Sequence, residues 1–108
     1  MSGEFDAKAV NLASLVEYQA GSVVSREVVR KPTGTVTVFA FDAGQGLSEH
    51  TAPFDAVVQV LDGEVMLTIG GKEIPAVAGE TVLMPANVPH SLHATQPFKM
   101  LLTMIRGS

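Results

Sequence analysis

Residues 44–63 of this 108-residue chain read GQGLSEHTAPFDAVVQVLDG, and they carry much of what the sequence says about the fold. The stretch begins in a glycine-rich bend and continues through a short strand pattern to His50. Pro53 then interrupts it, because proline cannot donate to a strand ladder. The apolar run 56–61 indicates a buried strand, and the Asp-Gly pair at its end supplies the positive φ of a hairpin turn. The stretch therefore predicts strand, loop, strand and hairpin turn, in that order.

The same β pattern extends over most of the chain. Valine-rich or alternating segments separated by glycine and proline turns recur roughly every 8–12 residues, which is typical of a sandwich or barrel. The first twenty residues differ: 1–8 predict a tail, and Asn11 predicts the cap of a short helical turn over 12–16. We thus expect an N-terminal segment, 1–20, and an all-β domain, 21–108. The expected strands are 22–30, 35–41, 47–50, 56–61, 64–69, 72–77, 81–84, 90–94 and 98–105.

Composition excludes several classes of protein. A chain of this length forms a single domain. Its formal net charge is −4 and its seven Lys and Arg are spread along the sequence, which argues against nucleic acid as a partner. The absence of cysteine excludes disulfides and thiolate metal sites. No apolar run approaches the roughly 20 residues that span a membrane, and the N-terminus lacks the apolar core of a signal peptide, so a cytoplasmic protein is expected.

A second stretch, residues 79–90, reads GETVLMPANVPH. Together the two stretches resemble the two sequence motifs of the cupins, over residues 44–94. The first motif begins with a glycine, and a histidine follows after five further residues. Another glycine ends the motif at the spacing found in the family. The second motif has glycine, proline and histidine at matching positions. The matching residues are Gly44, His50 and Gly63 in the first motif and Gly79, Pro85 and His90 in the second.

The chain departs from the family pattern at four positions. The second histidine of the first motif falls on Ala52 and its glutamate on Ala56. In the second motif, Asn87 stands for a glycine and Ala94 for the final asparagine. Two of the four positions that hold a metal ion in the family are therefore alanine. A tightly held transition metal usually has three or four side-chain ligands, so we expect weak metal binding here.

The resemblance implies an all-β fold, an antiparallel jelly-roll barrel of the RmlC-like, conserved-barrel type. It also implies a homodimer, and a divalent transition metal (Zn, Ni, Fe or Mn) held weakly by His50 and His90. An exposed sheet edge points to the dimer independently, because the valine-rich strand 22–30 must be covered. The expected partners are thus a small molecule and a second copy of the chain, with no nucleic acid and no membrane.

The pleat of a strand predicts which side chains face one cavity, because residues of one parity share a face. By this rule His90 shares a face with Leu92, whereas Ser91 and His93 point the other way. Gln59 lies in an apolar strand and must satisfy its amide, either in a structural hydrogen bond or as a pocket donor or weak ligand. The residues expected to line the cavity are His50, Ala52, Ala56, Val58, Gln59, Met84, His90 and Leu92.

Three functions stay open on these residues. The first is a small-molecule-binding or sensing barrel with no chemistry of its own. The second is a metal-dependent enzyme of dioxygenase, isomerase or decarboxylase type, with His50 and His90 as ligands and Glu49 or Asp55 as a candidate acid or base. The third is a structural dimer with a vestigial site. The sequence contains no Ser/His/Asp triad, phosphate-binding loop or dinucleotide fingerprint.

Overall fold

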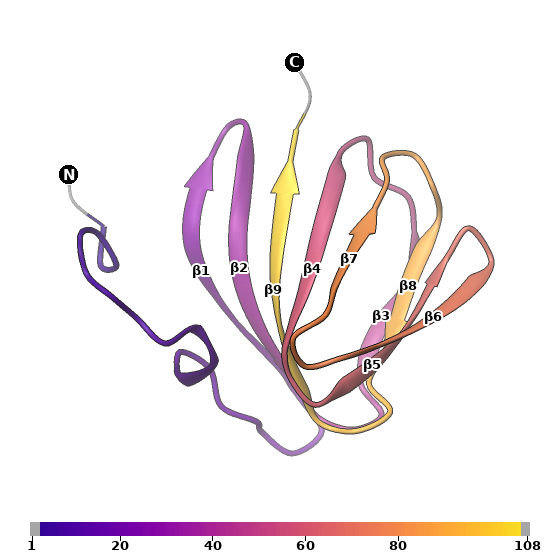
Figure 1. Cartoon of the computed structure of the whole chain (residues 1–108), viewed down its shortest axis with the longest axis horizontal. Coiled ribbons are helices and arrows are strands. Elements are labelled where there is room, and N and C mark those ends of the chain that lie inside the picture. The colour runs from indigo at the N-terminus through magenta and orange to yellow at the C-terminus, as the bar shows by residue number, and fades with distance from the viewer. Residues whose placement is uncertain (1–2, 107–108) are drawn as a thin grey trace.

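The computed structural model describes residues 3–106, which form nine β-strands and one short 3-10 turn (Figure 1). The strands make a five-stranded sheet, in the order β1-β2-β9-β4-β7, and a four-stranded sheet, in the order β3-β8-β5-β6. All pairings are antiparallel, which confirms the prediction of an all-β jelly-roll barrel. The elements are η1 (Leu12–Ser14), β1 (Val23–Lys31), β2 (Gly34–Phe41), β3 (Gly46–His50), β4 (Asp55–Asp62), β5 (Glu64–Ile69), β6 (Lys72–Val77), β7 (Thr81–Met84), β8 (His90–His93) and β9 (Phe98–Ile105).

The strand boundaries differ from the expected ones by a residue at several ends. Strand β4 is longer than predicted because its ladder with β9 runs from Asp55 to Asp62. Strand β8 ends one residue early, because the N–H of Ala94 leaves the ladder and donates to the carbonyl of Gln45 at 2.8 Å. Within residues 3–106 no helix is long and apolar enough to span a membrane.

The two sheets converge at one end of the barrel and splay apart at the other (Figure 1). At the closed end Phe41 and Phe98 are ladder partners, and their rings stack with centroids 4.8 Å apart. Both side chains are completely buried. Gly63 turns the chain beside them at φ 75°, and a Cβ on it would lie 2.1 Å from the carbonyl oxygen of Pro97, so only glycine fits. The closed end is therefore packed solid.

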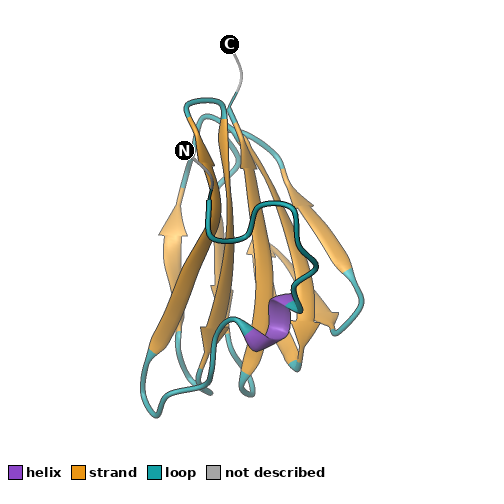
Figure 2. Ribbon diagram, turned by 90° about the vertical axis from the view of Figure 1, so that its left-hand side faces the viewer, coloured by secondary structure: helices purple, strands orange, loops and turns teal. Residues whose placement is uncertain are grey.

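The N-terminal segment crosses the outer face of the five-stranded sheet (Figure 2). Val16 is buried there against β2, in a small apolar cluster separate from the main core. Asn11 occupies the N-cap position of η1 but makes no side-chain cap hydrogen bond, so that detail of the prediction is wrong. In the predicted tail, Glu4 pairs with Arg26 of β1, and Phe5 lies under the same guanidinium. Residues 1 and 2 of the tail lie outside the described residues.

Tyr18 fixes the end of this segment near the closed end of the barrel. Its hydroxyl donates to Asp62 Oδ2 at 2.5 Å. Burial, the hydrogen bond and the nearby Asp62 charge together raise the pKa of Tyr18 well above its usual range. The ammonium of Lys99 lies 5.1 Å from the ring centroid and donates to the carbonyl of Ala13 at 2.6 Å. The segment is thus attached by polar contacts as well as by apolar burial.

Candidate functional site

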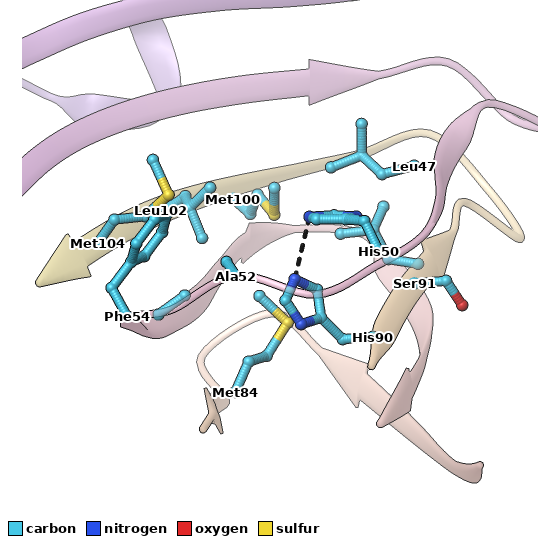
Figure 3. Close-up of a pocket in the computed structure, with 12 residues that line it drawn as sticks. Leu47, His50, Ala52, Phe54, Met84, His90, Ser91, Met100, Leu102 and Met104 are labelled. Atoms are coloured by element: carbon cyan, nitrogen blue, oxygen red, sulfur yellow. Dashed lines mark hydrogen bonds between the residues drawn. The ribbon is translucent and has the colours of Figure 1, made fainter. Parts of the chain in front are cut away.

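Two histidines meet at the open end of the barrel. His50 is the last residue of β3 and His90 the first of β8, and the two are ladder partners. Their Nε2 atoms lie 3.1 Å apart and their rings cross at 71° (Figure 3). His90 is 7% exposed, whereas His50 faces solvent on one side. The strands therefore bring the two residues together, as the motif spacing predicts.

The hydrogen bonds of the two Nδ1 atoms determine what this histidine pair can bind. His50 Nδ1 lies 2.9 Å from the carbonyl oxygen of Ser48, and His90 Nδ1 lies 3.1 Å from that of Val88. A carbonyl only accepts, so each Nδ1 carries the hydrogen, and each Nε2 of a neutral ring presents a lone pair. Two lone pairs at this distance repel each other unless a cation or a donor group of a ligand contacts both nitrogens. With both rings neutral, the pair is therefore an acceptor site.

The histidine pair forms the polar end of an otherwise apolar pocket of about 110 Å³. Nine of its twelve lining residues are apolar, three of them methionines. The hydroxyl of Ser91 points away from the pocket, which leaves the imidazoles as its polar groups (Figure 3). Apolar walls with a few polar groups are typical of small-molecule sites. The lining residues are Leu47, His50, Ala52, Phe54, Ala56, Met84, His90, Ser91, Leu92, Met100, Leu102 and Met104.

Six of the eight residues expected to line the cavity do so, and two do not. Gln59 points outward from β4 and is exposed, so its amide is open to solvent, and its predicted place in the cavity is wrong. Val58 lies on the inward face, but it is completely buried in the core below the pocket. Alternation along β4 explains the first correction, since Ala56, Val58 and Val60 face inward and Gln59 cannot. The second follows from depth, because Val58 lies deeper in the barrel than Ala56.

Neither candidate carboxylate reaches the pocket. Asp55 Oδ1 accepts the backbone N–H of Ala86 at 2.8 Å, which is a structural bond between the start of β4 and the loop from β7 to β8. Glu49 is exposed and lines a different, shallow hollow on the four-stranded sheet. His93 is exposed and lines that hollow too, as its parity predicts. The pocket therefore contains no acidic side chain among the residues that line it.

Several walls of the pocket are not among the residues expected to line it. Strand β9 supplies three of them, Met100, Leu102 and Met104, through the inward alternation that starts at Phe98. This alternation was visible in the sequence, but nothing there shows which end of the strand borders a cavity. Phe54 comes from the irregular loop after Pro53, which has no periodicity to indicate its direction.

Two loops hold the histidines in place. The N–H of Asn87, between β7 and β8, donates to the carbonyl of Ala52 at 2.7 Å. Asn87 has φ 64°, a left-handed conformation that asparagine tolerates better than most residues. It stands where the second motif expects a glycine, so the substitution preserves the turn. The loops that follow His50 and precede His90 are thereby fixed to one another.

The residues present do not fit a closed transition-metal site. Two nitrogen ligands at about 2.1 Å from one ion, at roughly 90–110° to each other, lie roughly 3.0–3.4 Å apart, so the histidine pair matches two adjacent positions. Within residues 3–106, however, no group of three or more His, Cys, Asp or Glu side chains is placed to hold a metal ion. Ala52 and Ala56 border the pocket and supply no ligand atom. Water or a bound molecule would have to fill the other positions.

Comparisons with known proteins agree with this architecture. A family model described as the cupin domain matches residues 37–105. The structure resembles a conserved protein of unknown function from Streptococcus pyogenes, with TM-score 0.90 and 34% identity over 94% of this chain and 90% of that one. A cupin 2 conserved barrel domain protein from Leptotrichia buccalis is 44% identical, with TM-score 0.87, over 90% of this chain and 47% of that one.

A cupin superfamily protein from Desulfitobacterium hafniense has TM-score 0.88 and 26% identity, over 94% of this chain and 93% of that one. No curated protein matches the chain closely. The fold, the two motifs and the family model lead to one conclusion: the chain is a member of the cupin family.

Proposed function

We propose that the barrel binds a small, largely apolar molecule at its open end, with the histidine pair as the polar contact. One observation carries the proposal: two imidazoles, each fixed through Nδ1 by a backbone carbonyl, close an otherwise apolar pocket. Its volume of about 110 Å³ is somewhat below that of a cavity of about 150 Å³ that holds benzene. A ligand of this size has a small ring or a branched chain, or extends out of the open end.

The chemistry of the pocket walls restricts the class of possible ligands further. In the neutral pair each Nε2 presents a lone pair, so the ligand gains most if it carries a hydroxyl or N–H group at that end. Met84 and Met104 supply flexible, polarizable walls that adapt to the shape of the apolar body. The expected ligand is therefore an apolar molecule with a single donor group, bound without covalent chemistry.

Phenol and toluene provide a test, because they have similar shapes and only phenol has a donor. Signals from the methyl groups of Met84 and Met104 should shift on titration in NMR spectra. The wild-type protein should bind phenol about twofold to tenfold more tightly than toluene, the range of one neutral hydrogen bond. The substitution His90→Leu should remove that preference, and His93→Leu, at the exposed histidine on the other face, should preserve it. If neither compound shifts the methionine signals, the proposal fails.

A metal-dependent enzyme is the second candidate, favoured by the Nε2–Nε2 distance of 3.1 Å. That distance suits two adjacent ligands of one ion, although the alanines at 52 and 56 leave the set incomplete. The metal content of protein purified without a His-tag or added metal separates the candidates. Stoichiometric Zn, Ni, Fe or Mn that survives dialysis against a chelator would favour the enzyme, and loss of the metal would favour the binding protein.

We also propose that the chain forms a homodimer. Strand β1 is the edge of the five-stranded sheet, and two of its valines, Val23 and Val29, are 39% and 42% exposed. Pairing with the β1 of a second copy would cover this edge. Sedimentation at low micromolar concentration should give a dimer, and a species of only 11.3 kDa would contradict it. A dimer that binds neither compound nor metal would leave the structural role as the remaining function.

A further inference from the structure

A hollow of about 380 Å³ at the open end of the barrel gathers positive charge. It is lined by Arg30 and Lys31 from the end of β1, by Pro32 and Thr35, and by Arg106 just after β9. Three of the seven Lys and Arg residues of an acidic chain thus meet in one place. The sequence separates them by up to 76 positions (106 minus 30), so only the fold brings them together.

The chain neutralises this charge only in part. Arg30 Nε lies 3.0 Å from a carboxylate oxygen of Glu27, which balances one of the three cations. Among residues 3–106, the only other ion pair joins Arg26 and Glu4, so Lys31 and Arg106 have no acidic partner there. Arg106 is also held in position: its guanidinium lies 5.5 Å from the ring centroid of Phe54, and its backbone N–H donates to Thr33 at 2.8 Å.

Thr35 also lines this hollow. Its Oγ1 is buried and has no hydrogen-bond partner among the described residues, which costs free energy because the group has lost its water. The other polar side chains that line the hollow are a lysine and two arginines, which only donate. A threonine hydroxyl can also donate. A negatively charged group with several acceptor oxygens complements these donor side chains.

We propose that this hollow binds a small oxyanion, such as a phosphate, sulfate or carboxylate group. Guanidinium groups suit oxyanions because they can donate two parallel N–H bonds. The hollow borders the apolar pocket, since Phe54 lies under Arg106 and also lines that pocket, and Thr35 is the ladder partner of Met104. The oxyanion is therefore either a free ion or the charged end of a molecule whose apolar body occupies the pocket. The site rests on residues other than the histidines and holds even if the pocket binds nothing.

Titration with inorganic phosphate, followed through the amide signals of Thr35 and Arg106, tests the site. The shifts should saturate, and Arg106→Gln should weaken binding about tenfold, the loss of one charged hydrogen bond. The matched control is Lys72→Gln, which removes an exposed cation from the distant β5–β6 turn and should leave the affinity unchanged. If chloride at equal ionic strength causes the same shifts, or if both variants weaken binding equally, the effect is general screening and the proposal is wrong.

The substitution Thr35→Val tests the buried hydroxyl separately. Without phosphate the variant should melt at the same temperature as the wild type or higher, because an unsatisfied polar atom is gone. With phosphate it should gain less thermal stability than the wild type. A lower melting temperature without phosphate, or an unchanged gain with it, would remove the hydroxyl from the site and overturn this part of the proposal.

Phenyl phosphate distinguishes the two sources of the oxyanion. If it binds more tightly than inorganic phosphate and also shifts the Met84 methyl signal, the site receives the charged end of a pocket ligand. If the two bind equally and Met84 is unaffected, the site receives a free anion. His90→Leu should leave the affinity for inorganic phosphate unchanged in either case, which separates this site from the histidine pair. If neither compound shows saturable binding, there is no oxyanion site.

Discussion

The two ends of the barrel are built from the same strands but differ in packing. Along β9 the inward side chains Phe98 and Met100 are fully buried, whereas Leu102 and Met104, farther along the same face, are only partly buried. The sheets converge around the start of β9 and splay around its end (Figure 1). One unbroken alternation of apolar residues therefore makes a solid core at one end and a pocket at the other.

This difference separates stability from binding within a single domain. At the closed end, stacked phenylalanines leave no room for a ligand. At the open end, Ala52 and Ala56 stand where the family pattern has a histidine and a glutamate, and both now border the pocket. Small side chains there widen the cavity, and the solid core at the other end keeps the sheets together. Substitutions at the two ends should consequently have different effects.

The largest expected loss of stability comes from removing a buried ring at the closed end. Phe98→Ala should lower the free energy of unfolding by about 3–5 kcal/mol, because it removes a fully buried ring and leaves a cavity. The matched variant at the open end, Phe54→Ala, should cost only about 1 kcal/mol, since that ring is half-buried in the wall of a pocket. Urea denaturation measures both. Equal losses would mean that the open end is packed as tightly as the closed end.

A smaller but specific effect should come from rebuilding the missing ligands at the open end. Ala52→His combined with Ala56→Glu would complete four metal ligands around His50 and His90. We expect the affinity for Zn²⁺ or Ni²⁺ to rise by at least about 100-fold. Loss of a residue that only supports a metal ligand already lowers metal affinity by up to about 100-fold, and direct ligands contribute more. Competition with a chromogenic chelator measures the gain.

Two further variants control this experiment. The single change Ala52→His adds a third histidine without placing a carboxylate at the buried position 56, and should give part of the gain if the double variant does not fold. Gln59→His with Thr81→Glu adds the same two side chains to outward-facing, paired positions and should give much less. If the folded double variant shows no gain over the native protein, Ala52 and Ala56 do not correspond to the family's ligand positions.

The sequence predicts the strands and the histidine pair, but it does not predict the cationic hollow. Turn spacing and period-2 patterns suffice for the nine strands and for the meeting of His50 and His90, because those are set by local geometry and motif spacing. The position of Gln59 follows from the alternation along β4, once the ladder register is known. The cationic hollow does not follow from the sequence, because Lys31, Thr35 and Arg106 come together only when β1, β2 and β9 pair.

The smallest expected effect concerns the attachment of the N-terminal segment near the closed end. Tyr18→Phe removes the hydroxyl that donates to Asp62 but keeps the ring beside Lys99. The free energy of unfolding should fall by about 0.5–1.5 kcal/mol at pH 7, the net contribution of one hydrogen bond. His50→Gln, a matched change at the open end, removes an exposed ring and should cost less. Urea denaturation at pH 7 measures both.

The pH dependence of the Tyr18→Phe effect identifies the interaction. Burial, the hydrogen bond and the Asp62 charge raise the pKa of Tyr18 in the folded protein above its ordinary value of 10.0. The stabilisation by the hydroxyl is therefore fully present below pH 10, and it declines above pH 10, where the unfolded chain ionises and the folded chain does not. The difference in stability between wild type and Tyr18→Phe should be constant from pH 6 to pH 9 and narrow at about pH 10.5–11. If wild type and Tyr18→Phe are equally stable at every pH, Tyr18 contributes through its ring alone, and apolar burial of the neighbouring Val16 attaches the segment. A nonzero difference that stays constant through pH 11 would contradict the raised pKa of Tyr18.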